Sequence, residues 1–327
     1  MFPIHVTSAY PEGPGNFAAG RARQALTEGG IPGFAHTADP AAARAVLFLE
    51  HHPDSDPFFL AVLRHPLVRR FPEKCLLCHD HDLVVPFLPG FYSSLRRADL
   101  RPGVVESAIY LHQHCPNPAI RATPVTGTEP YLFSFVGAVR THPVRRELLR
   151  LAGPEALIED TSGRNGWELD DAARRSFHEH YARTLTDSRF VLCPRGAGPN
   201  SYRIYESMQA GRAPVIVSDD FAPPAGLPWA DFALFVPEAA VDSLPRILND
   251  ASPRAAALGL AARRIWEESC SWPAGFARLC QSIRARTEAG ATVHPHPLWK
   301  AAHRVATSST AARLLVRSLR QRRAPAA

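Results

Sequence analysis

The sequence has no apolar run that approaches the ~20 residues needed to span a bilayer as a helix. Its N-terminus, MFPIHVTSAYPEG, lacks a basic start followed by an apolar run, so we expect no secretory signal. The six cysteines are scattered rather than dense, which excludes a small disulfide scaffold. We therefore expect a cytoplasmic protein, with peripheral contact to the inner face of a membrane as an alternative.

The composition predicts a packed globular protein. The chain has 327 residues, which is enough for two ordinary domains, and 46% of them are hydrophobic. The net charge is +6, and a group of arginines after residue 312 contributes to it. A basic balance suits nucleic acid, a membrane or an anion pocket. We expect no nucleic-acid partner, because aromatic platforms do not alternate with basic residues in a recognisable module.

Short apolar runs alternate with helical patterns, which is typical of α/β sheets with both faces covered. The proline- and threonine-rich segment 117–130 predicts a link between two domains. We predict domains at 1–128 and 129–285 and a basic tail at 286–327, with two Rossmann-like domains facing a cleft. Expected strands are 4–6, 45–49, 74–77, 83–85, 131–136, 189–194, 213–218 and 233–236; expected helices are 17–28, 58–67, 143–151, 172–185, 241–248 and 255–269.

The most informative stretch is RFVLCPRGAGPNSYRIYESMQAGRAPVIVSDD, which begins at Arg189 and predicts strand, loop, helix and strand. Gly196 in the loop lets the backbone approach a ligand closely. Asn200 or Ser201 suits the start of the helix, where free backbone amides favour an anion. Arg195 can add a bidentate grip on a phosphate. The stretch therefore predicts a site for a phosphate-bearing ligand.

A carboxylate and a second arginine turn belong to the same prediction. Arg203 and Glu206 lie one helical turn apart and so share a face. Glu206 can accept hydrogen bonds from a ribose diol at the mouth of the loop. Upstream, a strand runs into Gly137 and Arg140, which we expect to converge on the same anion. The alternative is that Arg203 and Glu206 form only a surface ion pair worth under ~1 kcal/mol.

These motifs, taken in order, resemble the C-terminal signature of the exostosin family of glycosyltransferases. The resemblance covers about residues 131–248, and the N-terminal half matches only loosely. The matching elements are Phe135-Val136-Gly137 with Arg140, Cys193-Pro194-Arg195-Gly196, Ser201-Tyr202-Arg203, Glu206, Gln209-Ala210-Gly211, Pro214-Val215-Ile216 and Ser218-Asp219-Asp220.

The resemblance implies a GT-B type, inverting glycosyltransferase. Its C-terminal domain would bind a nucleotide-sugar donor, usually a uridine diphosphate sugar, and its N-terminal domain a glycan or lipid-linked acceptor. No cofactor or metal is required if arginines and a helix dipole neutralise the leaving diphosphate. The implied donor-binding residues are Arg140 and Arg195 at the diphosphate, Asn200 and Ser201 at the helix start, Glu206 at the ribose, and Gly196 and Arg203 beside them.

Inversion requires a base on the acceptor hydroxyl, which the N-terminal half should supply. The best candidate is the cluster His79-Asp80-His81-Asp82 between two strand-like runs. Asp82 or Asp80 would take the proton, with a histidine as rival. The alternative is a polar loop without catalytic function. In that case the protein would be a catalytically inactive nucleotide- or glycan-binding protein of the same fold.

Two further features predict no site of their own. Cys75 and Cys78, followed by His79 and His81, have the spacing of a metal half-site. A structural zinc needs four ligands and no second Cys-x-x-Cys exists, so we predict two buried cysteines and no metal. The tail 301–323 has either the pattern of an amphipathic helix on an anionic membrane or that of a solvated terminus.

Overall fold

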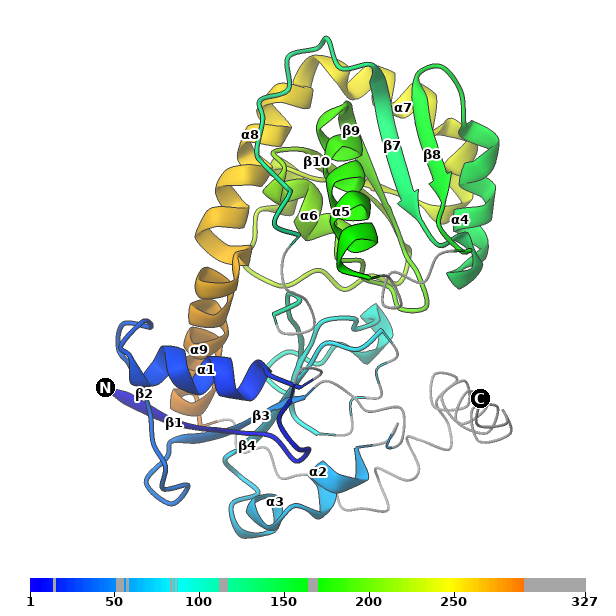
Figure 1. The fold of residues 1–327 in the computed structure, drawn as a ribbon. Helices are drawn as coiled ribbons and strands as arrows, with labels where there is room; N and C mark the ends of the chain where they lie inside the picture. The colour runs from blue at the N-terminus through cyan, green and yellow to red at the C-terminus, as the bar shows by residue number, and fades with distance from the viewer. Residues whose placement is uncertain are drawn as a thin grey trace. The chain divides into compact units, whose positions relative to one another are not determined.

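The computed structural model describes residues 1–13, 16–50, 56, 59–82, 84, 86, 88–111, 117–163 and 170–290. The chain forms two compact units. The first comprises Met1–His114, Ala222–Pro224 and the chain from Gly275 on, and the second comprises Cys115–Phe221 and Ala225–Ala274. Each unit is built on its own parallel sheet, which confirms the predicted α/β class with two Rossmann-like domains (Figure 1).

The first sheet has the order β2-β1-β3-β4-β5-β6, and every neighbouring pair is parallel. Strands β3 and β4 are buried along their whole length, because helices or loops cover both faces. The elements are β1 (Phe2–Thr7), α1 (Ala18–Thr27), β2 (Phe34–His36), β3 (Ala45–Glu50), α2 (Leu60–Arg64), α3 (Pro66–Arg70), β4 (Cys75–His79), β5 (Gly90–Tyr92), the 3-10 turn Arg97–Asp99, β6 (Val105–Ser107) and α9 (Trp272–Glu288).

One predicted helix of this unit, 58–67, is divided into α2 and α3. His65 is extended, with φ −60° and ψ 137°, because the ring of Pro66 disfavours a helical residue before it. Pro66 then begins α3, where its missing N–H leaves no helical hydrogen bond unmade. The predicted strand 83–85 includes residues outside the described part of the chain.

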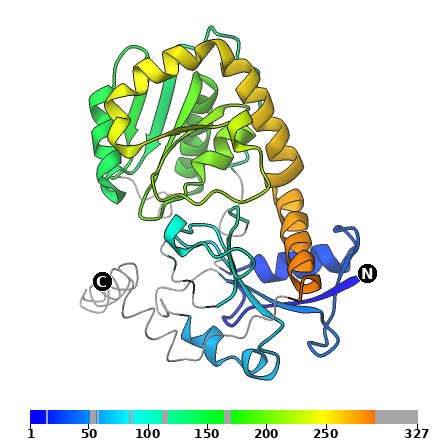
Figure 2. The ribbon, with the colours of Figure 1, turned by 180° about the vertical axis from the view of Figure 1, so that it is seen from behind.

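The second sheet has the order β11-β10-β9-β7-β8 and is also parallel throughout. Helices cover both of its faces, as Figures 1 and 2 show from opposite sides. The elements are β7 (Tyr131–Gly137), α4 (Pro143–Leu148), β8 (Ala156–Asp160), α5 (Asp171–Thr186), β9 (Ser188–Pro194), α6 (Arg203–Gln209), β10 (Ala213–Val217), β11 (Leu234–Val236), α7 (Leu244–Ala251) and α8 (Ala255–Ile265).

Each sheet has one point at which the chain reverses its direction of winding. In the second sheet, β7 is followed by β8 at one edge, whereas β9 is followed by β10 and β11 toward the other edge. In the first sheet the same reversal lies between β1 and β3. The loops after the two adjoining strands diverge there, and ligands of open α/β sheets bind in the crevice that results.

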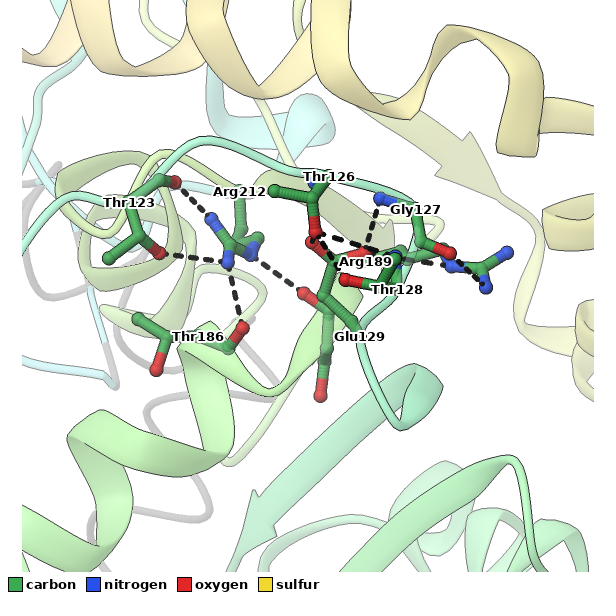
Figure 3. Close-up of polar contacts among 9 residues, drawn as sticks. Thr123, Thr126, Gly127, Thr128, Glu129, Thr186, Arg189 and Arg212 are labelled. Atoms are coloured by element: carbon green, nitrogen blue, oxygen red, sulfur yellow. Dashed lines mark hydrogen bonds and ion pairs between the residues drawn. The ribbon is translucent and has the colours of Figure 1, made fainter.

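The segment 117–130 is fastened to the second unit by Arg212, whose exposed fraction is 1% (Figure 3). Its Nε donates to Ser188 O at 2.7 Å, and its Nη2 donates to Thr186 O at 2.8 Å. Nη2 also donates to Thr123 Oγ1 at 3.0 Å. Arg212 precedes β10 and Ser188 begins β9, so this anchor lies at the amino-terminal edge of the sheet.

Helix α9 was not expected from the sequence. Helix α8 leads into a π-helical turn, Trp266–Cys270, in which Ser271 N donates to Trp266 O at 2.7 Å. A Cβ on Gly275 would collide with the side chain of Ile109, so α9 packs closely there and a larger residue would displace that side chain. The predicted tail begins inside this helix, and its remainder from 291 lies outside the described residues. None of the described helices has the length and apolarity needed to cross a membrane.

Candidate functional site

Arg203, at the start of α6, bridges the reversal point of the second sheet. Its Nε donates to Val136 O on β7 at 2.8 Å, and its guanidinium lies over the Phe135 ring, 5.3 Å from the centroid. A Cβ on Gly137 would lie 2.7 Å from Arg203 Cζ, so the approach requires glycine there. Neither Nη donates a hydrogen bond to a described residue, and Nη2 lies next to Gly137, so the guanidinium keeps N–H groups that can bind an anion beside this glycine.

Glu206 is partly buried one turn further along α6. Tyr181 on α5 donates its hydroxyl proton to Glu206 Oε2 at 2.6 Å. Burial raises the pKa of the Glu206 carboxyl, while the Tyr181 hydrogen bond and the Arg203 charge act against that shift. Within the described residues Arg203 and Glu206 form no hydrogen bond, so they are not the surface ion pair considered above. Their side chains instead engage β7 and α5.

Arg195 follows β9 as expected, but its charge is already balanced. It is 8% exposed, and its Nη1 lies 3.2 Å from Asp220 Oδ2 and 3.6 Å from Glu238 Oε1. Its Nε is buried and finds no hydrogen-bond acceptor in the described part of the chain. Two carboxylates therefore compete with any phosphate for this guanidinium, and its predicted role at a diphosphate stays a prediction.

Arg145 on α4 is a site residue that the motifs did not indicate. Its Nε donates to Arg195 O at 2.8 Å and its Nη2 to Pro194 O at 3.1 Å, while Nη1 donates to Ala138 O at 3.1 Å. A Cβ on Gly196 would lie 3.0 Å from Arg145 Nη2, which explains why the loop has glycine there. Arg145 thus ties the loops after β7 and β9 together.

Two guanidinium groups lie over the ring of Phe135. Arg145 stands over its ring at 5.6 Å from the centroid and Arg203 at 5.3 Å. An aromatic residue at this strand position therefore supports both arginines. The sequence offered a signal for this, because a phenylalanine two residues before Gly137 belongs to the motif, but its contacts depend on the packing of α4 and α6.

Arg140 and the predicted cap residues take different positions around the loops. Arg140 is exposed, and its backbone N–H donates to Ser162 Oγ at 3.3 Å. Asn200 and Ser201 are buried and precede α6; Asn200 Oδ1 accepts from Ser201 N at 2.8 Å, and Ser201 Oγ accepts from Arg203 N at 3.4 Å. The N-cap of α6 is Tyr202, which makes no side-chain capping hydrogen bond, so Asn200 and Ser201 order the turn before the helix instead of capping it as expected. Gly211 has φ +75° and follows the last turn of α6 as a left-handed cap.

In the first unit the predicted base residues follow β4. Asp80 is fully buried, whereas Asp82 is partly buried and accepts a hydrogen bond from Tyr110 Oη at 3.2 Å. Of the two carboxylates, only Asp82 is reachable from solvent. Glu50, at the end of β3, was missed: it accepts from Ser8 Oγ at 2.7 Å and from Ala9 N at 2.6 Å. These contacts span the reversal point of the first sheet.

Cys75 and Cys78 are buried in β4, and burial raises the pKa of both thiols, to about 12 for Cys75. Residues three apart on a strand point to opposite faces, so these two thiols cannot bind one metal ion. Across the described ranges no three His, Cys, Asp or Glu side chains gather as a metal would need.

Residues 94–251 match the model of the Exostosin GT47 domain. Exostosin-1 homolog of Caenorhabditis elegans is 31% identical over 106 residues, which cover 30% of this chain and 28% of the relative. Exostosin-1 of Drosophila melanogaster is 26% identical over 195 residues, covering 54% of this chain and 26% of the relative. Ribitol-5-phosphate xylosyltransferase 1 of Danio rerio is 30% identical over 110 residues, covering 32% of this chain and 24% of the relative.

The chain therefore spans about a quarter of the length of these curated relatives. Among solved structures, sucrose-phosphate synthase from Thermosynechococcus elongatus aligns with a TM-score of 0.45 at 15% identity, over 76% of this chain and 75% of that chain. The matched domain contains the arginine bridge, Tyr181 and Glu206. Residues 94–251, just under half of the chain, are thus similar to the Exostosin GT47 domain.

Proposed function

We propose that the protein is an inverting glycosyltransferase that moves a sugar from a nucleotide diphosphate sugar, a uridine diphosphate sugar in the first instance, to a glycan or lipid-linked acceptor. One observation carries the proposal. Arg203 presents two Nη groups and Glu206 presents a carboxylate from one helix, next to the loops at the reversal point of an exostosin domain. That pair suits a phosphate group joined to a ribose diol.

In this proposal the site residues of the second unit have separate roles. Arg203 binds the diphosphate through its two Nη groups, and the exposed Arg140 adds a second cation at the loop after β7. Glu206 accepts hydrogen bonds from the ribose hydroxyls. Cationic groups stabilise the charge that develops on the leaving diphosphate, which is a role that a metal plays elsewhere. Arg145 positions the loops and has no contact with the donor.

The proton acceptor in this proposal is Asp82. Its carboxylate is partly exposed and Tyr110 orients it, whereas the buried Asp80 cannot reach an acceptor hydroxyl as it stands. Asp82 takes the proton from the acceptor hydroxyl as that oxygen bonds to the anomeric carbon. The bond to the diphosphate oxygen breaks on the opposite face, so the configuration inverts.

The proposal is tested by a thermal-shift screen of the wild type against nucleoside diphosphates and their sugars. We expect a uridine diphosphate or its sugar to raise the melting temperature, since a ligand that binds only the folded state stabilises it. Arg203→Gln should lose that shift, while Arg174→Gln, a substitution of a half-exposed arginine on α5, should keep it. Equal shifts for both variants would contradict the donor site.

Turnover is tested separately, by release of the nucleoside diphosphate in the presence of candidate acceptors. Stabilisation by a donor without any release of diphosphate across an acceptor panel would instead support an inactive nucleotide-binding protein. If no nucleotide raises the melting temperature of the protein, the proposal as a whole is contradicted.

A further inference from the structure

Tyr181 makes the closest polar contact of Glu206, yet it lies on α5 and outside the motifs of the site. It is 7% exposed, and its hydroxyl lies 2.6 Å from Glu206 Oε2. That separation is in the range of hydrogen bonds from a hydroxyl to an ionised carboxylate. The other oxygen, Oε1, accepts no hydrogen bond from the described residues. One oxygen of Glu206 is therefore held and the other is left for a ligand.

We propose that Tyr181 is a positioning residue, which holds Oε2 of Glu206 so that Oε1 meets the ribose diol of the donor as an oriented carboxylate. This inference rests on the proposed function, because it assigns a partner to the residue that would bind the ribose. It adds a residue from another helix, without which α6 alone does not fix the rotamer of the glutamate.

The surroundings show why a glutamate here depends on such a partner. Three titratable groups face it: Tyr181 from α5, Cys193 from β9 and Arg203 from α6. Burial raises the pKa of the Tyr181 hydroxyl, and it raises that of the Cys193 thiol to about 12, so both are neutral near pH 7. Arg203 therefore supplies the only charge that favours an ionised Glu206 in this group.

Two opposing influences act on the pKa of a carboxylate in this position. Burial raises the pKa of Glu206, whereas the Tyr181 hydroxyl and the Arg203 guanidinium lower it. Removing the hydroxyl alone would raise that pKa further and would also free the carboxylate to rotate. Both changes weaken acceptance of hydrogen bonds from a diol, and the first makes the loss depend on pH.

The test compares Tyr181→Phe with a matched control in the other unit. Tyr92 is also buried, and its hydroxyl donates to Leu88 O at 2.6 Å, so Tyr92→Phe removes a hydrogen bond of equal length away from the site. Calorimetry measures the binding of uridine diphosphate to the wild type and both variants, from mildly acidic to mildly alkaline pH. Each variant is first checked for a cooperative melt.

For Tyr181→Phe we expect affinity to fall about tenfold or more, as for a lost hydrogen bond to a charged group. The pH below which binding weakens should also move upward relative to the wild type. Tyr92→Phe should change neither quantity. Unchanged affinity and an unchanged pH profile in Tyr181→Phe would overturn the positioning role while leaving the proposed function standing. A wild type that binds no nucleotide would overturn both.

If Tyr181→Phe does not fold, the wild type decides. Uridine diphosphate should bind more tightly than its 2′-deoxy analogue, and that preference should shrink as the pH falls and Glu206 takes up a proton. A preference that stays constant across the pH range would show that no oriented, ionised glutamate meets the diol, and would overturn the inference.

Discussion

The two reversal points of this chain have the same topology and opposite chemistry. In the first sheet Glu50, at the end of β3, accepts hydrogen bonds from Ser8 and Ala9 beyond β1. In the second sheet Arg203, at the start of α6, donates to Val136 on β7. At the first reversal point the hydrogen bonds are accepted by a carboxylate, and at the second the hydrogen bond is donated by a guanidinium. The two pairs of strands occupy equivalent places in their sheets.

Equivalent strand ends of the two sheets thus carry side chains of opposite charge. In the second unit the loops after β7 and β9 bring arginines together, which favours an anion. In the first unit the strand ends carry Glu50, Asp80 and Asp82, which favour hydroxyl groups and proton transfer. Under the proposed function, the basic side chains of the second unit would suit the donor and the acidic side chains of the first unit the acceptor.

The largest effect is expected when an acidic side chain of the first unit is removed. Asp82→Asn removes the proposed proton acceptor, so the rate of transfer should fall by about 100-fold or more. Binding of the nucleotide should not change, because its residues lie in the second unit. Steady-state transfer and calorimetry on the same protein separate the two. Asp99→Asn, a change in a partly buried ion pair with Arg96, is the control and should leave both unchanged.

A wild-type transfer rate in Asp82→Asn would remove that residue from the mechanism. Asp80→Asn then becomes the informative variant, since its carboxylate is buried at the end of β4. A loss of transfer in that variant without a loss of stability would assign the proton acceptor to Asp80.

Next in size is the contrast between the buried arginines of the two units. Arg212→Met leaves the carbonyls of Thr186 and Ser188 without their donor, so unfolding should become easier by about 3 kcal/mol or more. Arg286 on α9 donates to Val104 O at 3.0 Å, and its buried Nη2 has no partner among the described residues. Arg286→Met should therefore cost less than about 1 kcal/mol.

Urea unfolding of both variants measures this contrast. Equal losses for the two arginines would show that the hydrogen bonds of Arg212 do not decide the stability of the second unit. The expected order would show that the Arg212 anchor in Figure 3 stabilises the second unit. This anchor joins the segment 117–130 to the start of two strands.

A smaller effect is expected when Glu206 and Glu50, one in each unit, are exchanged for amides. Glu206→Gln should weaken binding of uridine diphosphate about tenfold or more, as for a lost charged hydrogen bond to the ribose. Glu50→Gln should leave that affinity unchanged, because its contacts are with Ser8 and Ala9. Calorimetry with uridine diphosphate in a single buffer measures the affinity of both variants. Comparable losses in both variants would break the assignment of the donor to the second unit.

The smallest effect is the pH dependence of stability at Glu206. Its pKa is raised in the folded state by burial, so its contribution to stability is full below the unfolded pKa and is lost as the pH rises through the folded pKa. The amide in Glu206→Gln does not titrate. As the pH is lowered from neutral, the melting temperature of the wild type should therefore rise relative to that of the variant. Melts of both proteins over this range measure it, and a constant difference would contradict the raised pKa.

Much of the fold could be read from the sequence because the central strands are continuous apolar runs. The predicted runs at 45–49, 131–136, 189–194 and 213–218 correspond to β3, β7, β9 and β10. Strands β2, β5 and β6 are three residues long, and their pairing with neighbours, not their composition, defines them. Helix α9 was missed because Trp272-Pro273-Ala274-Gly275 has the composition of a loop.

The candidate site was predicted in part for a similar reason. A linear motif identified Arg195, Arg203 and Glu206, whereas Arg145 and Tyr181 come from helices elsewhere in the chain. A buried tyrosine on a helix needs a partner for its hydroxyl, which is the one sequence signal that could have pointed to Tyr181. Which acceptor it finds depends on how α5 packs beside α6.

The parallel sheets, the glycine turns and the resemblance to the exostosin family can be read from the sequence, because apolar runs, turn residues and an ordered motif are local properties. The tertiary structure alone decided which charges remain for a ligand. It pairs Arg195 with Asp220 and Glu238, commits Arg145 to backbone carbonyls, and leaves the Nη groups of Arg203 without a partner in the described chain. The reason is physical: the charge of a side chain is local, whereas the groups that balance it come from distant segments.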